Sequence, residues 1–316
     1  MRSNKVRLNC GITMPLLGFG TFSFPYDSHK TQLAVQTALK MGYRHFDTAQ
    51  VYGSEPAVGY ALSQSILHQT VDRQDFFVTS KLWGSDHHDP VSALNRTLKE
   101  VGMEYIDMYL VHWPVKLKPW AWYTMPNEED FEQNLEMEKT WAGMERCLDL
   151  GLCRSIGVSN FSTTKLIRLM DVASVPPAVN QVEMHPMWRQ AKLRGVCAEY
   201  NIHVSAYSPL GGPGNAWGST SVVDNPIIQS IALKHQLTPA QVALNWGLSK
   251  GCSMIVKSFN RNRMLENIQA LDMKLDDRDI TEIDKLEERK IMRAEVYVND
   301  TTSPYKTIEQ LWDGEI

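Results

Sequence analysis

Eight short, mostly apolar segments recur along this chain of 316 residues, and each precedes a segment with the apolar spacing of a helix. Several of them are continuous apolar runs rather than alternations, which is typical of parallel strands covered by helices. Eight strand–helix units predict an α/β protein with a (β/α)8 TIM barrel, formed as a single domain over residues 1–316. The predicted strands are marked by Leu17, Arg44, Phe77, Ile106, Ile156, Val179, Val204 and Ile255.

Turn and capping residues separate these elements, as where Asp89-Pro90 begins a helix and Gly42 ends one. The pattern predicts strands over 16–21, 44–47, 76–81, 105–112, 154–158, 178–182, 203–206 and 254–256. It predicts helices over 28–41, 55–69, 89–101, 135–150, 163–172, 190–200, 226–235, 239–249 and 261–271. An N-terminal hairpin is expected at 6–14, an extended loop at 113–134, and an irregular tail after Glu287 that covers the substrate pocket at one end of the barrel.

Composition excludes several classes of partner. Lysine and arginine total 32 against 36 acidic residues, and this net charge of −4 gives no general attraction to nucleic acid or to an anionic membrane. No apolar run approaches the roughly 18 residues that span a bilayer, and the first residues lack the apolar segment of a signal peptide. Five scattered cysteines without C-x-x-C spacing fit reduced thiols, and no heptad repeat is present. We therefore expect a cytoplasmic monomer.

Polar side chains lie where the predicted strands end. Active sites of such barrels are built at the carboxyl ends of the strands. One buried polar residue has an ordinary structural explanation, but a ring of them on one face requires hydrogen-bond partners or a ligand. The residues at these ends are Thr21, Asp47, Lys81, His112, Ser159, Asn160, Gln181, Tyr207, Ser208, Lys257 and Ser258.

Four of these neighbouring side chains suit proton transfer. Asp47, Lys81 and His112 end consecutive predicted strands, and Tyr52 lies in the turn after Asp47. A phenol ionises near pH ~10, so we expect an adjacent Lys81, oriented by Asp47, to lower the pKa of Tyr52 and make it a general acid. His112 is expected to polarise a carbonyl. Taken singly, Lys81 is more often a solvated charge and His112 a core histidine; together they predict a catalytic group.

The sequence around these residues resembles the aldo-keto reductases. The resemblance covers nearly the whole chain and implies a (β/α)8 barrel that binds NADPH, with an Asp-Tyr-Lys-His tetrad that matches Asp47, Tyr52, Lys81 and His112. The matching motifs are His-Phe-Asp-Thr-Ala at 45–49, Tyr-Gly-Ser-Glu at 52–55, Thr-Ser-Lys-Leu-Trp at 79–83, Val-His-Trp-Pro at 111–114, Ile-Gly-Val-Ser-Asn-Phe at 156–161, Asn-Gln-Val-Glu at 180–183, Tyr-Ser-Pro-Leu at 207–210 and Val-Lys-Ser at 256–258.

The same resemblance implies which residues hold the cofactor. Ser159, Asn160 and Gln181 would bind the carboxamide of the nicotinamide, on which Tyr207 would stack. Lys257 and Arg263, two cations at a helix start, favour the 2′-phosphate of NADPH over NADH. The remaining expected contacts are Thr21, Ser208, Leu210, Ser258, Phe259, Glu266 and Asn267.

Aromatic residues in the loops at this end predict an apolar substrate pocket around a polar centre. The residues expected there are Phe22, Trp83, His112, Trp113, Trp120 and Trp217. The stretch His87-His88-Asp89 is not expected to bind a metal, because adjacent residues in a helix-entry loop rarely share an ion.

Several loops resemble the plant branch of the family that acts in specialised metabolism. This implies reduction of a small-molecule ketone or aldehyde, such as a bicyclic ketone of tropane alkaloid synthesis. A broad-specificity reductase of detoxification and a non-catalytic NADPH-binding subunit remain open as alternatives.

Overall fold

The barrel predicted from the sequence is the observed fold. The computed structural model describes residues 4–123 and 125–316. Within these ranges eight parallel strands close into a barrel in the order β10-β3-β4-β5-β6-β7-β8-β9. The strands are β3 (Leu17–Gly20), β4 (His45–Asp47), β5 (Phe77–Leu82), β6 (Met108–Val111), β7 (Ile156–Ser159), β8 (Val179–Glu183), β9 (His203–Tyr207) and β10 (Ser253–Val256).

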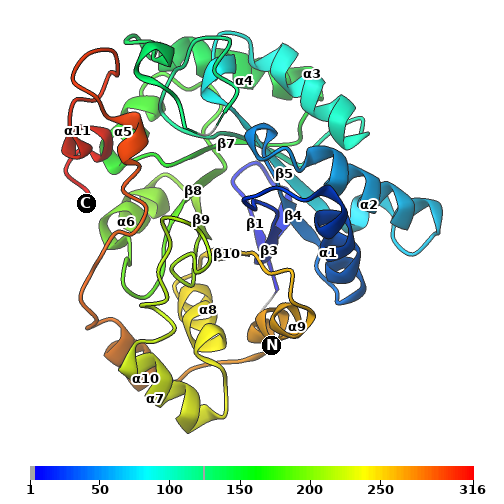
Figure 1. Cartoon of the computed structure of the whole chain (residues 1–316), viewed down its shortest axis with the longest axis vertical. Coiled ribbons are helices and arrows are strands. Elements are labelled where there is room, and N and C mark those ends of the chain that lie inside the picture. The colour runs from blue at the N-terminus through cyan, green and yellow to red at the C-terminus, as the bar shows by residue number, and fades with distance from the viewer. Residues whose placement is uncertain (1–3, 124) are drawn as a thin grey trace.

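Helices surround this ring of strands (Figure 1). The main apolar core lies between the two layers, where strand residues such as Val78 and Val158 meet helix residues such as Leu62 and Leu94. In the described ranges none of the helices is both long and apolar enough to cross a membrane. The helices are α1 (Ser28–Lys40), α2 (Glu55–Leu67), α3 (Pro90–Val101), α4 (Met137–Asp149), α5 (Thr163–Met170), α6 (Ala191–Glu199), α7 (Pro226–His235), α8 (Pro239–Ser249), α9 (Arg261–Gln269), α10 (Asp277–Ile283) and α11 (Ile308–Trp312).

The expected hairpin closes the amino-terminal end of the barrel. Its strands β1 (Lys5–Arg7) and β2 (Thr13–Pro15) pair antiparallel. Leu8 and Met14 pack against residues at the starts of the barrel strands, including Phe77. With that end covered, the carboxyl ends of the strands are left for a site.

The structure differs from the prediction in one strand, which is shorter than expected, and in two short helices that were not expected. The segment 105–112 contains β6 only from Met108, because Ile106 forms no more than an isolated bridge to Cys153. The tail, predicted to be irregular, contains the five-residue α11, in which the Thr307 side chain accepts a hydrogen bond from the Gln310 amide. That Thr-x-x-Gln cap was visible in the sequence, but the helix is too short to show periodicity. The short α10 was missed for the same reason.

Close contact between α2 and α3 depends on a glycine. A Cβ atom at Gly59 would lie 2.2 Å from the carbonyl oxygen of Val101, the last residue of α3. Backbone cannot move aside as a flexible side chain can, so only glycine lets the two helices approach this closely.

Gly59→Ala should therefore lower the free energy of unfolding by about 2 kcal/mol, because it overpacks a rigid contact. Gly195→Ala in α6 is the matched control, since a Cβ there meets nothing within 4 Å. That control should be neutral or stabilising by about 0.5 kcal/mol. Urea unfolding of the two variants measures the difference, and equal stabilities would contradict the packing argument.

Candidate active site

The four residues of the predicted tetrad converge at one end of the barrel. Asp47 is the last residue of β4, Lys81 lies in β5, and His112 follows β6 directly. Tyr52 ends a 3-10 turn at Gln50–Tyr52, between β4 and α2. Because β4, β5 and β6 are neighbours in the parallel barrel, their carboxyl ends bring these side chains together.

Asp47 and Lys81 form a buried ion pair. Lys81 Nζ donates to Asp47 Oδ1 at 2.6 Å and to the Thr48 carbonyl at 2.9 Å. The second carboxylate oxygen of Asp47 accepts from Gln181 Nε2 at 2.8 Å. Both charged side chains are nearly inaccessible to solvent. Burial lowers the pKa of Lys81, while the attraction of Asp47 opposes that shift.

Tyr52 contacts His112 rather than the Lys81 ammonium. The Tyr52 hydroxyl lies 3.3 Å from His112 Nε2, and Lys81 Nζ lies 4.9 Å from the centre of the phenol ring. Burial raises the pKa of Tyr52 well above 10.0, and the charge of Asp47 adds to this shift. The pKa of Tyr52 is therefore raised and not lowered as expected, because burial of the phenol is the dominant effect. Burial and the Lys81 charge lower the pKa of His112 well below 6.5, so its imidazole is neutral at neutral pH.

Hydroxyl groups hold the turn that carries Tyr52. Ser54 Oγ lies 2.8 Å from both Thr21 Oγ1 and Thr48 Oγ1, and Thr21 Oγ1 donates to the Asp47 carbonyl at 2.9 Å. Ser54 immediately precedes α2, a position where serine often caps a helix, but its side chain makes no capping hydrogen bond. Its hydroxyl fastens the ends of β3 and β4 to the turn instead. These contacts could not be predicted from the sequence, because hydroxyl groups at three separate positions leave no local pattern when they meet.

The residues expected to bind nicotinamide form one hydrogen-bonded network. Ser159 Oγ donates to the Gln181 carbonyl at 2.8 Å, and the Asn160 amide donates to the His112 carbonyl at 2.9 Å. The Tyr207 hydroxyl donates to Asn160 Oδ1 at 2.8 Å. Gln181 in turn contacts Asp47. The ends of β7, β8 and β9 are thereby tied to the four central residues.

A group of cations lies at the start of α9, beside the end of β10. Burial lowers the pKa of Lys257, and the charge of Arg263 lowers it further, so the two cations repel each other. Among the described residues neither has a carboxylate within ion-pair distance. Such uncompensated positive charge favours an anion. Ser258 is buried beside Lys257, and Phe259 stacks on Phe19 with ring centres 6.4 Å apart.

The other expected cofactor residues either follow a strand end or lie in α9. Thr21 follows β3, and Ser208 follows β9 with a positive φ of 50°. Leu210 packs against the core two residues later. In α9, Asn267 is buried and Glu266 is partly exposed.

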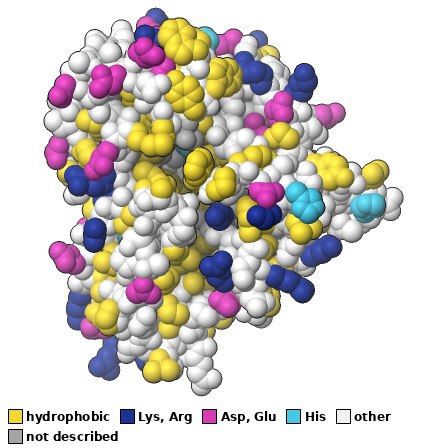
Figure 2. Space-filling view, viewed as in Figure 1, with side chains coloured by type: hydrophobic (Ala, Val, Ile, Leu, Met, Phe, Trp, Pro, Cys, Tyr) yellow, Lys and Arg dark blue, Asp and Glu magenta, His cyan; other side chains and the backbone are white. Residues whose placement is uncertain are grey.

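Aromatic rings surround Tyr52 and His112. Phe22 packs edge-on against Tyr52 at 5.1 Å, and Trp83 packs edge-on against His112 at 5.4 Å. Tyr297 from the tail lies 4.7 Å from Trp113 and 6.5 Å from Trp83. Figure 2 shows hydrophobic side chains gathered around a hollow on this face.

Two residues predicted to line the pocket, Trp120 and Trp217, are not part of this group of aromatic rings. Trp120 is 60% exposed, and its indole donates to Asp130 Oδ1 at 3.1 Å within the loop. Trp217 folds back toward Gly212, where its ring atoms would lie 2.7 Å from an added Cβ, and it lines a separate cavity. Local contacts in each loop therefore fix these two rings, and among the described residues neither ring packs against Tyr52 or His112.

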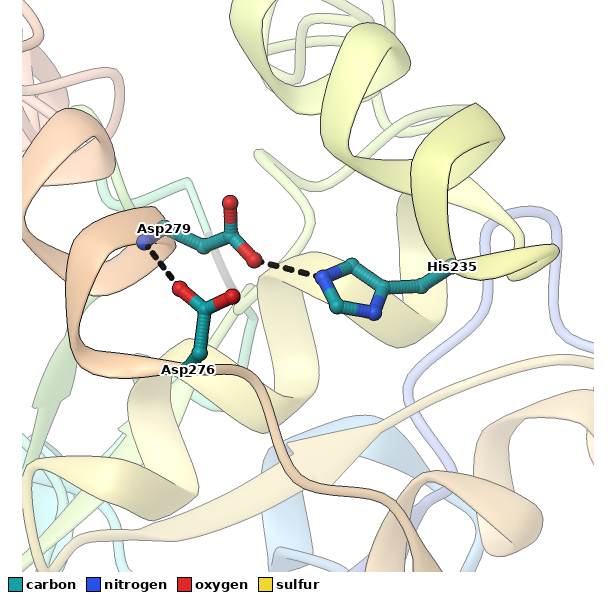
Figure 3. A group of neighbouring side chains, drawn as sticks. All are labelled: His235, Asp276 and Asp279. Atoms are coloured by element: carbon teal, nitrogen blue, oxygen red, sulfur yellow. Dashed lines mark hydrogen bonds and ion pairs between the residues drawn. The ribbon is translucent and has the colours of Figure 1, made fainter.

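A second polar cluster joins α7 to α10. His235 Nε2 contacts Asp279 Oδ2 at 2.5 Å, and Asp276 caps α10 by accepting from the Asp279 amide at 2.8 Å (Figure 3). Lys234 Nζ lies 2.8 Å from Asp279 Oδ1 and 2.9 Å from Asp276 Oδ2. An ammonium already lies between the carboxylates, so we interpret the cluster as a structural contact.

Comparison with known proteins agrees with this geometry. Residues 16–288 match the model of the aldo/keto reductase family. The chain belongs to the aldo-keto reductase family. This aldo-keto reductase is 44% identical over 307 residues to the (1S)-1,7-diacetoxy-luvungin A aldo-keto reductase of Citrus sinensis, covering 96% of this chain and 95% of that protein. It is 44% identical over 313 residues to deoxymugineic acid synthase 1 of Zea mays, covering 98% of each chain.

A solved structure extends the comparison to the fold. The aldose reductase of Schistosoma japonicum superimposes with a TM-score of 0.87 at 31% identity, over 97% of this chain and 99% of that one. Family membership and these relatives identify the protein as an oxidoreductase enzyme with plant reductases among its relatives.

Asp47→Asn should lower the free energy of unfolding by about 3 kcal/mol, because it leaves the buried Lys81 ammonium without a charged partner. Replacing both residues, as Asp47→Asn with Lys81→Met, should recover most of that loss. Urea unfolding measures each stability.

Asp27→Asn is the matched control, since Asp27 pairs with Lys30 on the surface and asparagine still caps α1. It should change stability by less than about 1 kcal/mol. An Asp47→Asn protein as stable as this control would contradict the assigned ion pair.

Proposed function

We propose that this aldo-keto reductase is an NADPH-dependent carbonyl reductase that converts a small-molecule ketone or aldehyde into an alcohol. The observation that supports it most is the convergence of Asp47, Tyr52, Lys81 and His112, with the Tyr52 hydroxyl 3.3 Å from His112 Nε2. A protonated phenol beside a neutral imidazole, inside an aromatic pocket, suits a carbonyl oxygen that must gain a proton.

The residues at the strand ends fit NADPH. Lys257 and Arg263 would hold the 2′-phosphate, since their mutual repulsion is relieved by an anion. The nicotinamide would be held by Asn160, Gln181 and Tyr207. Hydrogen bonds connect these three side chains to Asp47 and to the His112 carbonyl, so a ring bound there would lie beside the catalytic residues. When bound, NADPH supplies a hydride to the carbonyl carbon.

Tyr52 then supplies the proton. Its raised pKa keeps the phenol protonated at neutral pH, so it can donate to the oxygen that becomes an alkoxide as the hydride arrives. The carbonyl carbon gains the hydride and the carbonyl oxygen gains the proton, so the product is an alcohol. His112 would orient the carbonyl oxygen through its neutral imidazole. Lys81, held by Asp47, places positive charge beside the Tyr52 ring and stabilises the phenolate left behind.

For the substrate we propose a ketone of plant specialised metabolism, such as methylecgonone in tropane alkaloid synthesis. Resemblance to methylecgonone reductase, and more distantly to codeinone and deoxymugineic acid reductases, supports this choice, as do the aromatic rings of Phe22, Trp83, Trp113 and Tyr297. We propose that the enzyme works as a monomer in the cytoplasm. Its free cysteines support the proposed location.

Two rival functions use the same fold. A broad-specificity reductase of detoxification would reduce many aldehydes with similar efficiency, whereas the proposed enzyme prefers one class of ketone. A non-catalytic NADPH-binding subunit would bind the cofactor without oxidising it. The arrangement of Tyr52 and His112 favours a reductase over a binding subunit.

Tyr52→Phe should reduce turnover of a ketone by at least about 100-fold, because phenylalanine keeps the ring packing and removes the proton donor. NADPH affinity, measured by fluorescence titration, should stay within about twofold of wild type. Tyr60→Phe, at an exposed position of α2, is the control and should leave turnover unchanged. Near-wild-type turnover by the Tyr52→Phe protein would refute the assignment.

Arg263→Ala should weaken NADPH binding about tenfold or more while changing NADH binding little, since it removes a charge-assisted hydrogen bond to the 2′-phosphate. Arg261→Ala, two residues earlier in α9, is the matched control and should affect neither cofactor. Dissociation constants for both cofactors provide the measurement. Equal losses for NADPH and NADH would contradict the proposed 2′-phosphate site.

A further inference from the structure

A buried carboxylate fastens the C-terminal tail to the barrel. Glu183 is the last residue of β8 and its side chain is fully buried. Its Oε1 accepts from the Ile291 amide at 2.9 Å, and its Oε2 accepts from the Met292 amide at 3.0 Å. Burial acts to raise the pKa of Glu183, but contacts with His185 and Lys290 outweigh it and keep the carboxyl ionised at neutral pH.

Lys290 adds a charge to the same attachment. Its ammonium lies 3.8 Å from Glu183 Oε2. It also lies 3.5 Å from the centre of a Trp312 ring and 5.1 Å from that of Trp188. A cation over indole faces is attracted to them when water is excluded. Glu183 thus binds the tail backbone at Ile291 and Met292 directly. Through Lys290, which contacts Trp312, it also helps to hold α11.

Aromatic contacts continue from this attachment to the active site. Trp312 packs edge-on against Trp113 at 5.9 Å, and Trp113 packs against Tyr297 at 4.7 Å. Tyr297 lies 6.5 Å from Trp83, which packs against His112. Burial raises the pKa of Tyr297, so its phenol stays protonated at neutral pH.

The tail does not pack tightly against the barrel along its whole length. A cavity of about 1020 Å³ opens between α6 and the tail, and Lys290, which lies 3.8 Å from Glu183, is one of its lining residues. The apolar residues of the tail join a cluster with the loop after β6 that is distinct from the main core. Where such a gap separates a segment from the core, a few buried polar contacts determine its position.

We propose that Glu183 is a positioning residue that sets substrate selection by holding residues 290–297 so that Tyr297 forms part of the pocket wall. This inference rests on the proposed reductase function, because it concerns the same pocket. Glu183 does not touch the reacting atoms. It acts through the tail, so its loss should change the binding of a bulky substrate more than the chemical step.

The test compares Glu183→Gln with wild type on two substrates. A steroidal ketone is large enough to contact the part of the pocket wall formed by Tyr297, whereas 4-nitrobenzaldehyde is too small to depend on it. We expect the KM for the steroidal ketone to rise about tenfold with kcat within about twofold, and both constants for the aldehyde to stay within about twofold. Hydrogen exchange at the Ile291 and Met292 amides should accelerate at least about tenfold, because each loses a charged acceptor.

Glu288→Gln is the matched control, since Glu288 is an exposed tail carboxylate that pairs with Arg189. It should change neither exchange at those two amides nor the ratio of the two KM values. Lys290→Met keeps the apolar stem between the indoles and removes the charge. It should raise the KM for the steroidal ketone and the two amide exchange rates about threefold each, with the constants for the aldehyde unchanged. This variant provides the test if Glu183→Gln does not fold.

Unchanged exchange at Ile291 and Met292, or faster exchange with unchanged substrate preference, would overturn the proposal. A wild-type protein that reduces neither these probes nor methylecgonone would instead refute the proposed function. Exchange still reports on the Glu183 contact, because it requires no turnover.

Discussion

The buried ion pair of Asp47 and Lys81 is the interaction on which the rest of the site depends. Two charges removed from water are costly unless each finds close partners, and here Lys81 contacts a carboxylate and a carbonyl while Asp47 also accepts from Gln181. These contacts join β4, β5 and β8 across the barrel mouth. Tyr52 and His112 are positioned against this fixed pair, and the nicotinamide residues connect to it through Gln181.

The sequence predicts this central part because strand order in a parallel barrel determines which strand ends meet. Asp47, Lys81 and His112 each end or follow an apolar strand, so their convergence follows from topology. The raised pKa of Tyr52 could not be predicted, because it depends on how deeply the folded chain buries the phenol beside Asp47. The hydroxyl contacts of Ser54 depend likewise on distances that no local pattern encodes.

The loops and the tail were less predictable for a different reason. Trp120 and Trp217 are aromatic residues in the expected loops, but a hydrogen bond to Asp130 and a contact with Gly212 hold each ring within its own loop. Glu183, in contrast, lies two residues after Gln181 on the same face of β8, a spacing that can be read directly from the sequence. The catalytic residues lie at strand ends, whose arrangement follows from the barrel topology. The shape of the pocket depends on loops and a tail, whose positions are determined by tertiary contacts.

Transfer of deuterium from NADPH labelled at C4 to a ketone tests the central claim most directly. If the residues around Tyr52 form the active site of a carbonyl reductase, the carbinol carbon of the product should carry deuterium from the cofactor, and the Tyr52→Phe protein should form no such product. Binding of labelled NADPH without transfer to any ketone or aldehyde supplied would contradict the account.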